Sequence, residues 1–158
     1  MEFRKMRRFK QQLSEEECLA LLQKEPRGVL AVLGEGDYPY AVPLDFLYKD
    51  GKLYFHGARE GHKLDAVRGH DKVSFCVMDE GFRREGEWAL NIKSVIVFGR
   101  IRVMPCDEPG IEQLLRELGN KYNPDPGDVE REIRGLIARV QMLELTIEHM
   151  SGKIVNES

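Results

Sequence analysis

The sequence has few cysteines and no long apolar run, and each of these absences excludes a class of protein. The three cysteines, Cys18, Cys76 and Cys106, are odd in number and widely spaced, so no disulfide framework is expected. No apolar stretch is long enough to cross a bilayer, and no apolar segment of a secretory signal follows the basic N-terminus. These features predict a cytoplasmic protein with no membrane partner.

Two common cofactor signatures are also missing. The four histidines and three cysteines show neither a Cys-x-x-Cys nor a His-Glu-x-x-His spacing, so no metal site is predicted. No Gly-x-Gly-x-x-Gly follows a strand pattern, which argues against a Rossmann dinucleotide site.

The length and composition indicate one globular domain over residues 1–158. The chain has 42% hydrophobic and 32% charged residues, which suits a packed protein rather than a disordered one. Its first 12 residues form a basic arm that is either a solvated tail or a phosphate-binding segment. The net charge of −3 gives no overall attraction to nucleic acid, which is the least expected partner.

The hydrophobic pattern predicts a mainly β chain with peripheral helices. A capping box of Ser14 and Glu17 predicts a first helix that ends before Pro26. The other predicted helices begin at residue 61, run from about 107 to 122, and extend from a cap at Asp128 to about 136, so residues 107–137 are peripheral helices. Six strands are expected at residues 28–33, 38–48, 52–58, 72–78, 89–104 and 140–149.

Turn chemistry and strand order predict the fold class. Asp50-Gly51 is a two-residue hairpin signal. Pro39 and Pro43 predict that the strand at 38–48 is bulged or lies at a sheet edge, and Cys76 is expected in the core. Sequential hairpins without a βαβ rhythm favour an antiparallel six-stranded split β-barrel.

The segment Gly61-His62-Lys63 carries the clearest chemical signal. It follows a strand and opens a helix, where unpaired backbone N–H groups and the helix dipole favour an anion. Gly61 permits close approach of a ligand, and Lys63 adds a mobile positive charge. The segment is either a phosphate site or an ordinary helix start with a solvated lysine.

The order of four sequence motifs favours the interpretation of this segment as a phosphate site. YPYAVPL, YFHGA, EGHK and SVIVFGR lie between residues 38 and 100. Together with the preceding helix and the GVLAV strand, this order resembles the pyridoxamine 5′-phosphate oxidase-like FMN-binding split barrels, especially proteins related to 5-nitroimidazole resistance. The resemblance covers roughly residues 13–105.

The resemblance implies a set of cofactor-binding residues. The backbone of residues 41–44 would line the flavin ring, with Val42 and Leu44 offering peptide groups, and the segment 55–57 would flank the ribityl chain and ring. The phosphate would lie against Gly61, His62 and Lys63. The full set implied for the cofactor is Ala41, Val42, Pro43, Leu44, Phe55, His56, Gly57, Gly61, His62, Lys63, Trp88 and Ser94.

Several of these residues also have purely structural interpretations. His56 is either a hydrogen-bonded strand histidine or the catalytic group that donates a proton or orients the substrate. His62 is either a phosphate ligand or a simple helix residue. Trp88 either packs locally or reaches the site of a second subunit.

The functional hypothesis is an FMN-dependent oxidoreductase, with FAD as a possible cofactor. Reduced nicotinamide would donate electrons, and a small planar molecule such as a nitroaromatic would accept them. The alternative is a non-catalytic flavin- or haem-binding protein. The flavin would lie at the interface of a homodimer, because one small barrel leaves part of a flavin exposed. Since the C-terminal segment lacks an arginine cluster, true pyridoxamine-phosphate oxidase activity is not expected.

Overall fold

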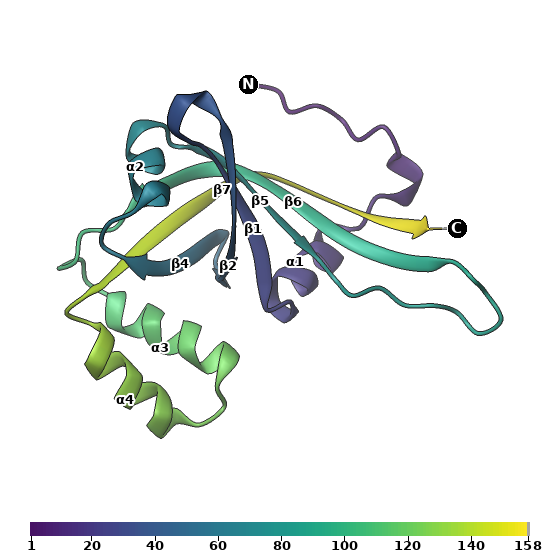
Figure 1. The fold of residues 1–158 in the computed structure, drawn as a ribbon. Coiled ribbons are helices and arrows are strands. Elements are labelled where there is room, and N and C mark those ends of the chain that lie inside the picture. The colour runs from purple at the N-terminus through teal and green to yellow at the C-terminus, as the bar shows by residue number, and fades with distance from the viewer. Residues whose placement is uncertain (158) are drawn as a thin grey trace.

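The computed structural model describes residues 1–157 and has a curled antiparallel sheet with helices at its periphery (Figure 1). The strands are β1 (Arg27–Leu33), β2 (Pro39–Asp45), β3 (Leu47–Lys49), β4 (Lys52–Ala58), β5 (Lys72–Met78), β6 (Leu90–Val103) and β7 (Val140–Glu157). The helices are α1 (Glu15–Lys24), α2 (His62–Gly69), α3 (Ile111–Tyr122) and α4 (Pro126–Leu136), with short 3-10 turns η1 (Phe9–Gln11) and η2 (Glu35–Asp37). The predicted fold class is confirmed.

The sheet has seven strands rather than the six expected, because the segment 38–48 is interrupted at Phe46. The strand order is β2-β1-β5-β6-β7-β4-β3, so the two halves of that segment lie at opposite edges. Phe46 is completely buried, and its N–H donates to Tyr122 Oη at 2.9 Å. Its carbonyl accepts a hydrogen bond from Lys121 Nζ at 2.9 Å. These contacts with α3 satisfy the peptide groups that leave the ladder.

The edge position of β2 confirms one of the two options that its prolines allowed. Its register with β1 runs without a break from Arg27 opposite Asp45 to Leu33 opposite Pro39. The other option, a bulge in this strand, is therefore wrong. Proline fits this strand without a bulge because its missing N–H faces the free edge.

Three further boundaries differ from prediction. Helix α3 begins at Ile111 rather than near residue 107, because Pro109 disfavours helix before it and Gly110 adopts a φ of 95°. The cap of α4 is Asp125, whose side chain accepts from Gly127 N–H, with Pro126 as the first helical residue. Strand β7 continues to residue 157 because residues 150–157 pair with β6.

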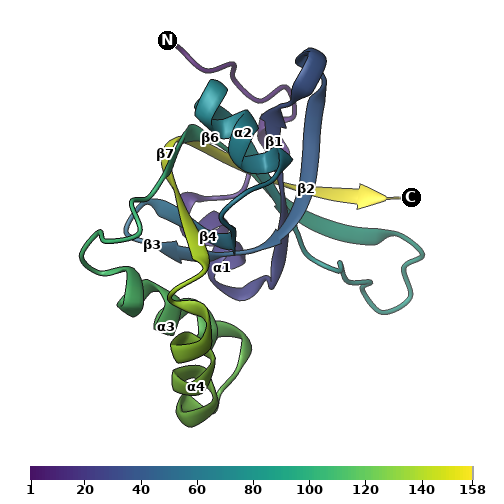
Figure 2. The same cartoon turned by 60° about the vertical axis from the view of Figure 1, so that its left-hand side comes forward.

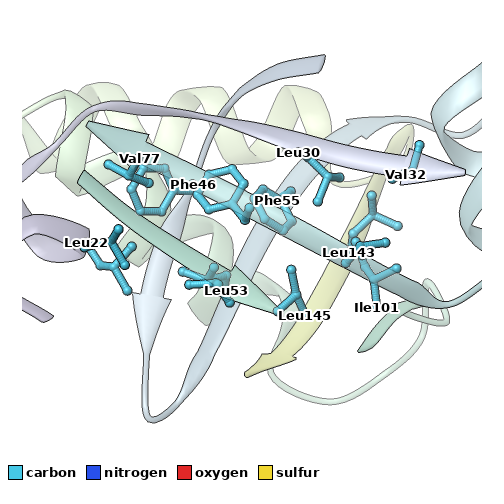
Figure 3. Packing of buried hydrophobic residues seen from close by; sticks show 14 of the residues in the cluster. Leu22, Leu30, Val32, Phe46, Leu53, Phe55, Val77, Ile101, Leu143 and Leu145 are labelled. Atoms are coloured by element: carbon cyan, nitrogen blue, oxygen red, sulfur yellow. The ribbon is translucent and has the colours of Figure 1, made fainter. Parts of the chain in front are cut away.

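The main core fills the concave side of the sheet (Figure 3). Phe46, Phe55 and Phe75 pack edge to face at its centre, with ring centroids 4.9 and 5.1 Å apart. A second cluster joins Tyr54 and Met142 to the inner faces of α3 and α4, so these helices cover the outer side of β4 and β7.

The outer side of β1, β2, β5 and β6 is covered only in part. Val29, Cys76 and Ile96 lie in one cross-strand row and are exposed, which corrects the core position predicted for Cys76. The N-terminal arm covers the neighbouring row, where the Phe3 ring stacks on His149 with centroids 4.6 Å apart. No helix within residues 1–157 is long and apolar enough to span a membrane.

Candidate functional site

The start of α2 leaves its first backbone N–H groups available. Gly61 occupies the cap position with a φ of 134°, and no side chain caps the helix. The first backbone bond of the helix runs from Asp65 N–H to the Gly61 carbonyl at 3.2 Å. The N–H groups of residues 62–64 therefore point out of the helix with the positive end of its dipole.

Lys63 bends back from α2 over strand β4. A Cβ atom added at Gly57 would lie 2.9 Å from Lys63 Nζ, so the glycine leaves the space that the ammonium occupies. Burial lowers the pKa of Lys63, and no carboxylate among the side chains of residues 1–156 forms an ion pair with it. A half-buried ammonium without a counter-charge next to an uncapped helix start is suited to an anion.

The His62 side chain is used within the protein. Its Nε2 accepts a hydrogen bond from Glu35 N–H at 3.2 Å, and its ring stacks on Tyr40 with centroids 4.2 Å apart. These contacts tie α2 to the β1–β2 connection. His62 can therefore offer its backbone N–H to an anion, while its side chain positions the helix.

Strand β2 presents unpaired peptide groups along its free edge. Antiparallel pairs alternate between hydrogen-bonded and non-bonded, and proline cannot donate. Pro39, Ala41 and Pro43 are thus the non-bonded positions, and their free groups point away from β1. The peptide groups of Val42 and Leu44, which were expected to serve the flavin ring, are used in the ladder with β1.

The same reasoning identifies free peptide groups on β4. Asp50 and Gly51 both have positive φ, so the two-residue hairpin closes on a hydrogen-bonded pair, Lys49 and Lys52. Strand β3 ends opposite Tyr54. The backbone N–H and C=O groups of His56 and Ala58 are therefore unpaired on the edge of β4 that faces β3. The curl of the sheet brings β2 and β4 together (Figure 2), so the two free edges form the split of the barrel.

His56 lies on the outer side of β4, toward α4. Desolvation lowers the pKa of His56, and the nearby charge of Lys63 lowers it further, while the carboxylates of Asp45 and Glu132 act in the opposite direction. The ring is therefore neutral near pH 7 and has both a donor and an acceptor nitrogen. Phe55, the preceding residue, is completely buried and points into the core.

Ser94 and Trp88 lie apart from this cluster. Ser94 is on β6, which is separated from β4 by β7 and from β2 by β1 and β5. Trp88 is 85% exposed in the loop between β5 and β6, which projects away from α2 (Figure 1).

Sequence reasoning missed the residues that support the site from a distance. Tyr40 and the Glu35 N–H hold His62, and Asp45 and Glu132 surround His56. These contacts join residues separated by 11 to 76 positions, so no local motif reports them. Among the side chains that the structure describes, residues 1–156, no group of histidine, cysteine, aspartate and glutamate is arranged to hold a metal ion.

Comparison with known proteins gives structural and sequence relatives. The chain is 28% identical to an FAD-binding protein from Mesorhizobium loti, covering 91% of this chain and 96% of that one, with a TM-score of 0.67. A candidate 5-nitroimidazole antibiotic resistance protein from Bacteroides thetaiotaomicron aligns with a TM-score of 0.75 at 15% identity, covering 92% and 87% of the two chains. An FAD- and haem-binding protein from Mycobacterium smegmatis aligns with a TM-score of 0.73 at 23% identity, covering 91% and 73%.

The search of curated proteins gave no significant match. The sequence profile described as pyridoxamine 5′-phosphate oxidase matches residues 14–154, which is most of the chain. This match agrees with the curled antiparallel sheet and with the motif order between β2 and β6. The chain therefore belongs to the pyridoxamine 5′-phosphate oxidase family.

Proposed function

We propose that this protein is an FMN-dependent oxidoreductase whose cofactor phosphate binds at Lys63 and the start of α2. The observation that carries the proposal is the half-buried Lys63 ammonium, which lies over Gly57 beside an uncapped helix N-terminus and has no carboxylate partner among the side chains of residues 1–156. An anion at this point would satisfy both the ammonium and the helix N–H groups. The FAD-binding relative from Mesorhizobium loti makes FAD the alternative flavin.

The residues along the split suit the rest of a flavin. The free edge of β2 offers the Ala41 N–H and the carbonyls of Ala41 and Pro43 to a polar ring edge, and His56 and Ala58 offer peptide groups from β4. Tyr40 lies at the α2 end of β2 and Asp45 at the other, about 17 Å apart for five residues of strand. We therefore assign the phosphate to the Tyr40 end and the ring to the Asp45 end.

When bound, the flavin would supply hydride transfer from a reduced nicotinamide to a small planar acceptor such as a nitroaromatic. The protein residues bind and orient the reacting molecules. Lys63 and α2 fix one end of the cofactor. His56, which is neutral near pH 7, holds a proton on one ring nitrogen close to the ring end of the split and is the candidate catalytic residue.

We also propose that the protein forms a homodimer with the flavin at its interface. The exposed row of Val29, Cys76 and Ile96 is an apolar sheet surface of the kind that pairs with a second copy. A two-fold partner would also give Ser94 and Trp88, which lie on or before β6 and away from β2 and β4 in the strand order, a way to contribute to a flavin at Lys63.

The test is the absorption spectrum of the purified protein and the mass of the released ligand. We expect a flavin spectrum, a released mass equal to FMN, and bleaching by reduced nicotinamide without oxygen. A flavin that reduced nicotinamide does not bleach would favour a binding or sensing role, and a haem Soret band would favour the haem-binding alternative. A colourless protein that fails to bind added FMN or FAD contradicts the proposal.

A further inference from the structure

A cavity of about 590 Å³ lies between strand β4 and the α3–α4 hairpin. Its floor is apolar and comes from the helices, with Leu118 on α3 and Leu136 on α4 among the lining residues. The polar part of its wall includes Asp45 at the end of β2, His56 on β4 and Glu132 on α4, and the hairpin adds Tyr122, Asn123, Asp128 and Arg131. A cavity that combines an apolar floor with converging polar side chains is a usual form of a small-molecule site.

The charges around this cavity are mainly negative. Its acidic residues are Asp45, Asp128 and Glu132, and its one strong cation is Arg131, which is already bonded to Asp128. Asp45 is paired with Arg27 at 2.9 Å, whereas no cation within residues 1–157 forms an ion pair with Glu132. The cavity therefore repels anionic groups such as the diphosphate of a nicotinamide cofactor.

His56 connects the cavity to the split of the barrel. Its peptide groups lie on the free edge of β4, and its imidazole lines the cavity. Asp45 does the same from the other side, because it ends β2 and also lines the cavity. A molecule in the cavity is thus next to the end of the split to which the flavin ring is assigned.

We propose that this cavity binds a small planar aromatic molecule that carries a cationic or hydrogen-bond-donating group, with Glu132 selecting for positive charge, and that it is the acceptor subsite of the enzyme. The position as an acceptor subsite rests on the proposed flavin function, whereas the charge preference of the cavity does not. The electron-donating nicotinamide, which carries a diphosphate, binds elsewhere.

Three redox-inert probes of similar size test the charge preference: benzylamine, benzyl alcohol and benzoate. Binding is measured by isothermal titration and by NMR shifts of the leucine and isoleucine methyl groups. The protein is used both free of flavin and saturated with FMN. We expect benzylamine to bind about two- to fivefold more tightly than benzyl alcohol, the size of a partly exposed ion pair, and benzoate to bind most weakly.

Two variants of cavity residues and one control variant test whether the probes bind in this cavity. Glu132→Gln should make benzylamine and benzyl alcohol bind equally, while Glu16→Gln, at an exposed carboxylate on α1, should leave the preference unchanged. Leu136→Trp should fill the half-buried floor and weaken the binding of all three probes. A thermal melt and the FMN absorbance of Leu136→Trp report separately whether it folds and binds flavin.

Each outcome of these binding measurements either supports the proposal or overturns it. Loss of the preference in Glu132→Gln alone, with methyl shifts at Leu118 and Leu136, supports the proposal. An unchanged preference in Glu132→Gln, methyl shifts elsewhere, or loss of probe binding on FMN saturation would overturn it. If the probes bind as expected but no flavin binds, the cavity is retained and the flavin function fails.

Discussion

At the residue scale, we expect His56 to make folding depend on pH, because desolvation lowers its pKa in the folded chain. As the pH falls, the unfolded chain binds the proton at the ordinary pKa of 6.5, before the folded chain does. The folded state therefore loses stability over the pH range from about 7 down to the lower pKa of the folded chain. We expect the free energy of unfolding in urea to drop between pH 7.5 and pH 5.0, and to drop less in His56→Gln. The exposed His70→Gln is the control, and an equal drop in all three proteins would contradict this assignment.

Gly57 is the residue that gives the Lys63 ammonium its place. In Gly57→Ala, the new Cβ atom would approach Lys63 Nζ to 2.9 Å and displace it from β4. We expect FMN affinity to fall by about tenfold, the effect of one weakened charged hydrogen bond, with thermal stability nearly unchanged. Gly69→Ala, where a Cβ meets nothing within 4 Å, is the matched control. Unchanged FMN affinity in Gly57→Ala would remove Lys63 from the site as described.

At the scale of the elements, Tyr122 on α3 stabilises the break at Phe46 between β2 and β3. The Tyr122 hydroxyl donates to the Pro26 carbonyl at 2.6 Å and accepts from Phe46 N–H at 2.9 Å. Tyr122→Phe leaves these peptide groups without their partner, so we expect a loss of about 1–3 kcal/mol in the free energy of unfolding. Denaturant titration measures the loss, and Tyr38→Phe, at an exposed tyrosine, should show none. A stability equal to that of the unchanged protein would show that the hydroxyl does not hold the break.

The elements that local chemistry determines could be predicted from sequence. The Ser14–Glu17 capping box, the Asp50-Gly51 hairpin and the helix start at Gly61 are all where the residues indicate. The break at Phe46 could not be predicted, because it depends on Lys121 and Tyr122 some 75 residues away. For the same reason, the sequence indicated Lys63 but not the contacts of His62 with Tyr40 and Glu35.

The whole molecule leaves an apolar sheet surface uncovered around Ile96, and the proposed dimer accounts for it. We expect sedimentation to give twice the chain mass. Ile96→Glu would bury an unpaired carboxylate at the interface at a cost of about 2 kcal/mol or more, and should shift the protein toward monomer. Ala138→Glu, at an exposed position after α4, should not. Monomers at all concentrations for the unchanged protein would contradict the dimer.

The most direct test of the flavin site is an FMN titration of the flavin-free protein, followed by quenching of flavin fluorescence. Lys63→Met removes the ammonium and keeps much of the side-chain volume, and Lys24→Met, at the exposed end of α1, is the matched control. We expect Lys63→Met to bind FMN about 10- to 100-fold more weakly, the effect of losing a charged hydrogen bond, and Lys24→Met to bind normally. Equal FMN affinity in Lys63→Met and the unchanged protein would contradict the phosphate site on which the function depends.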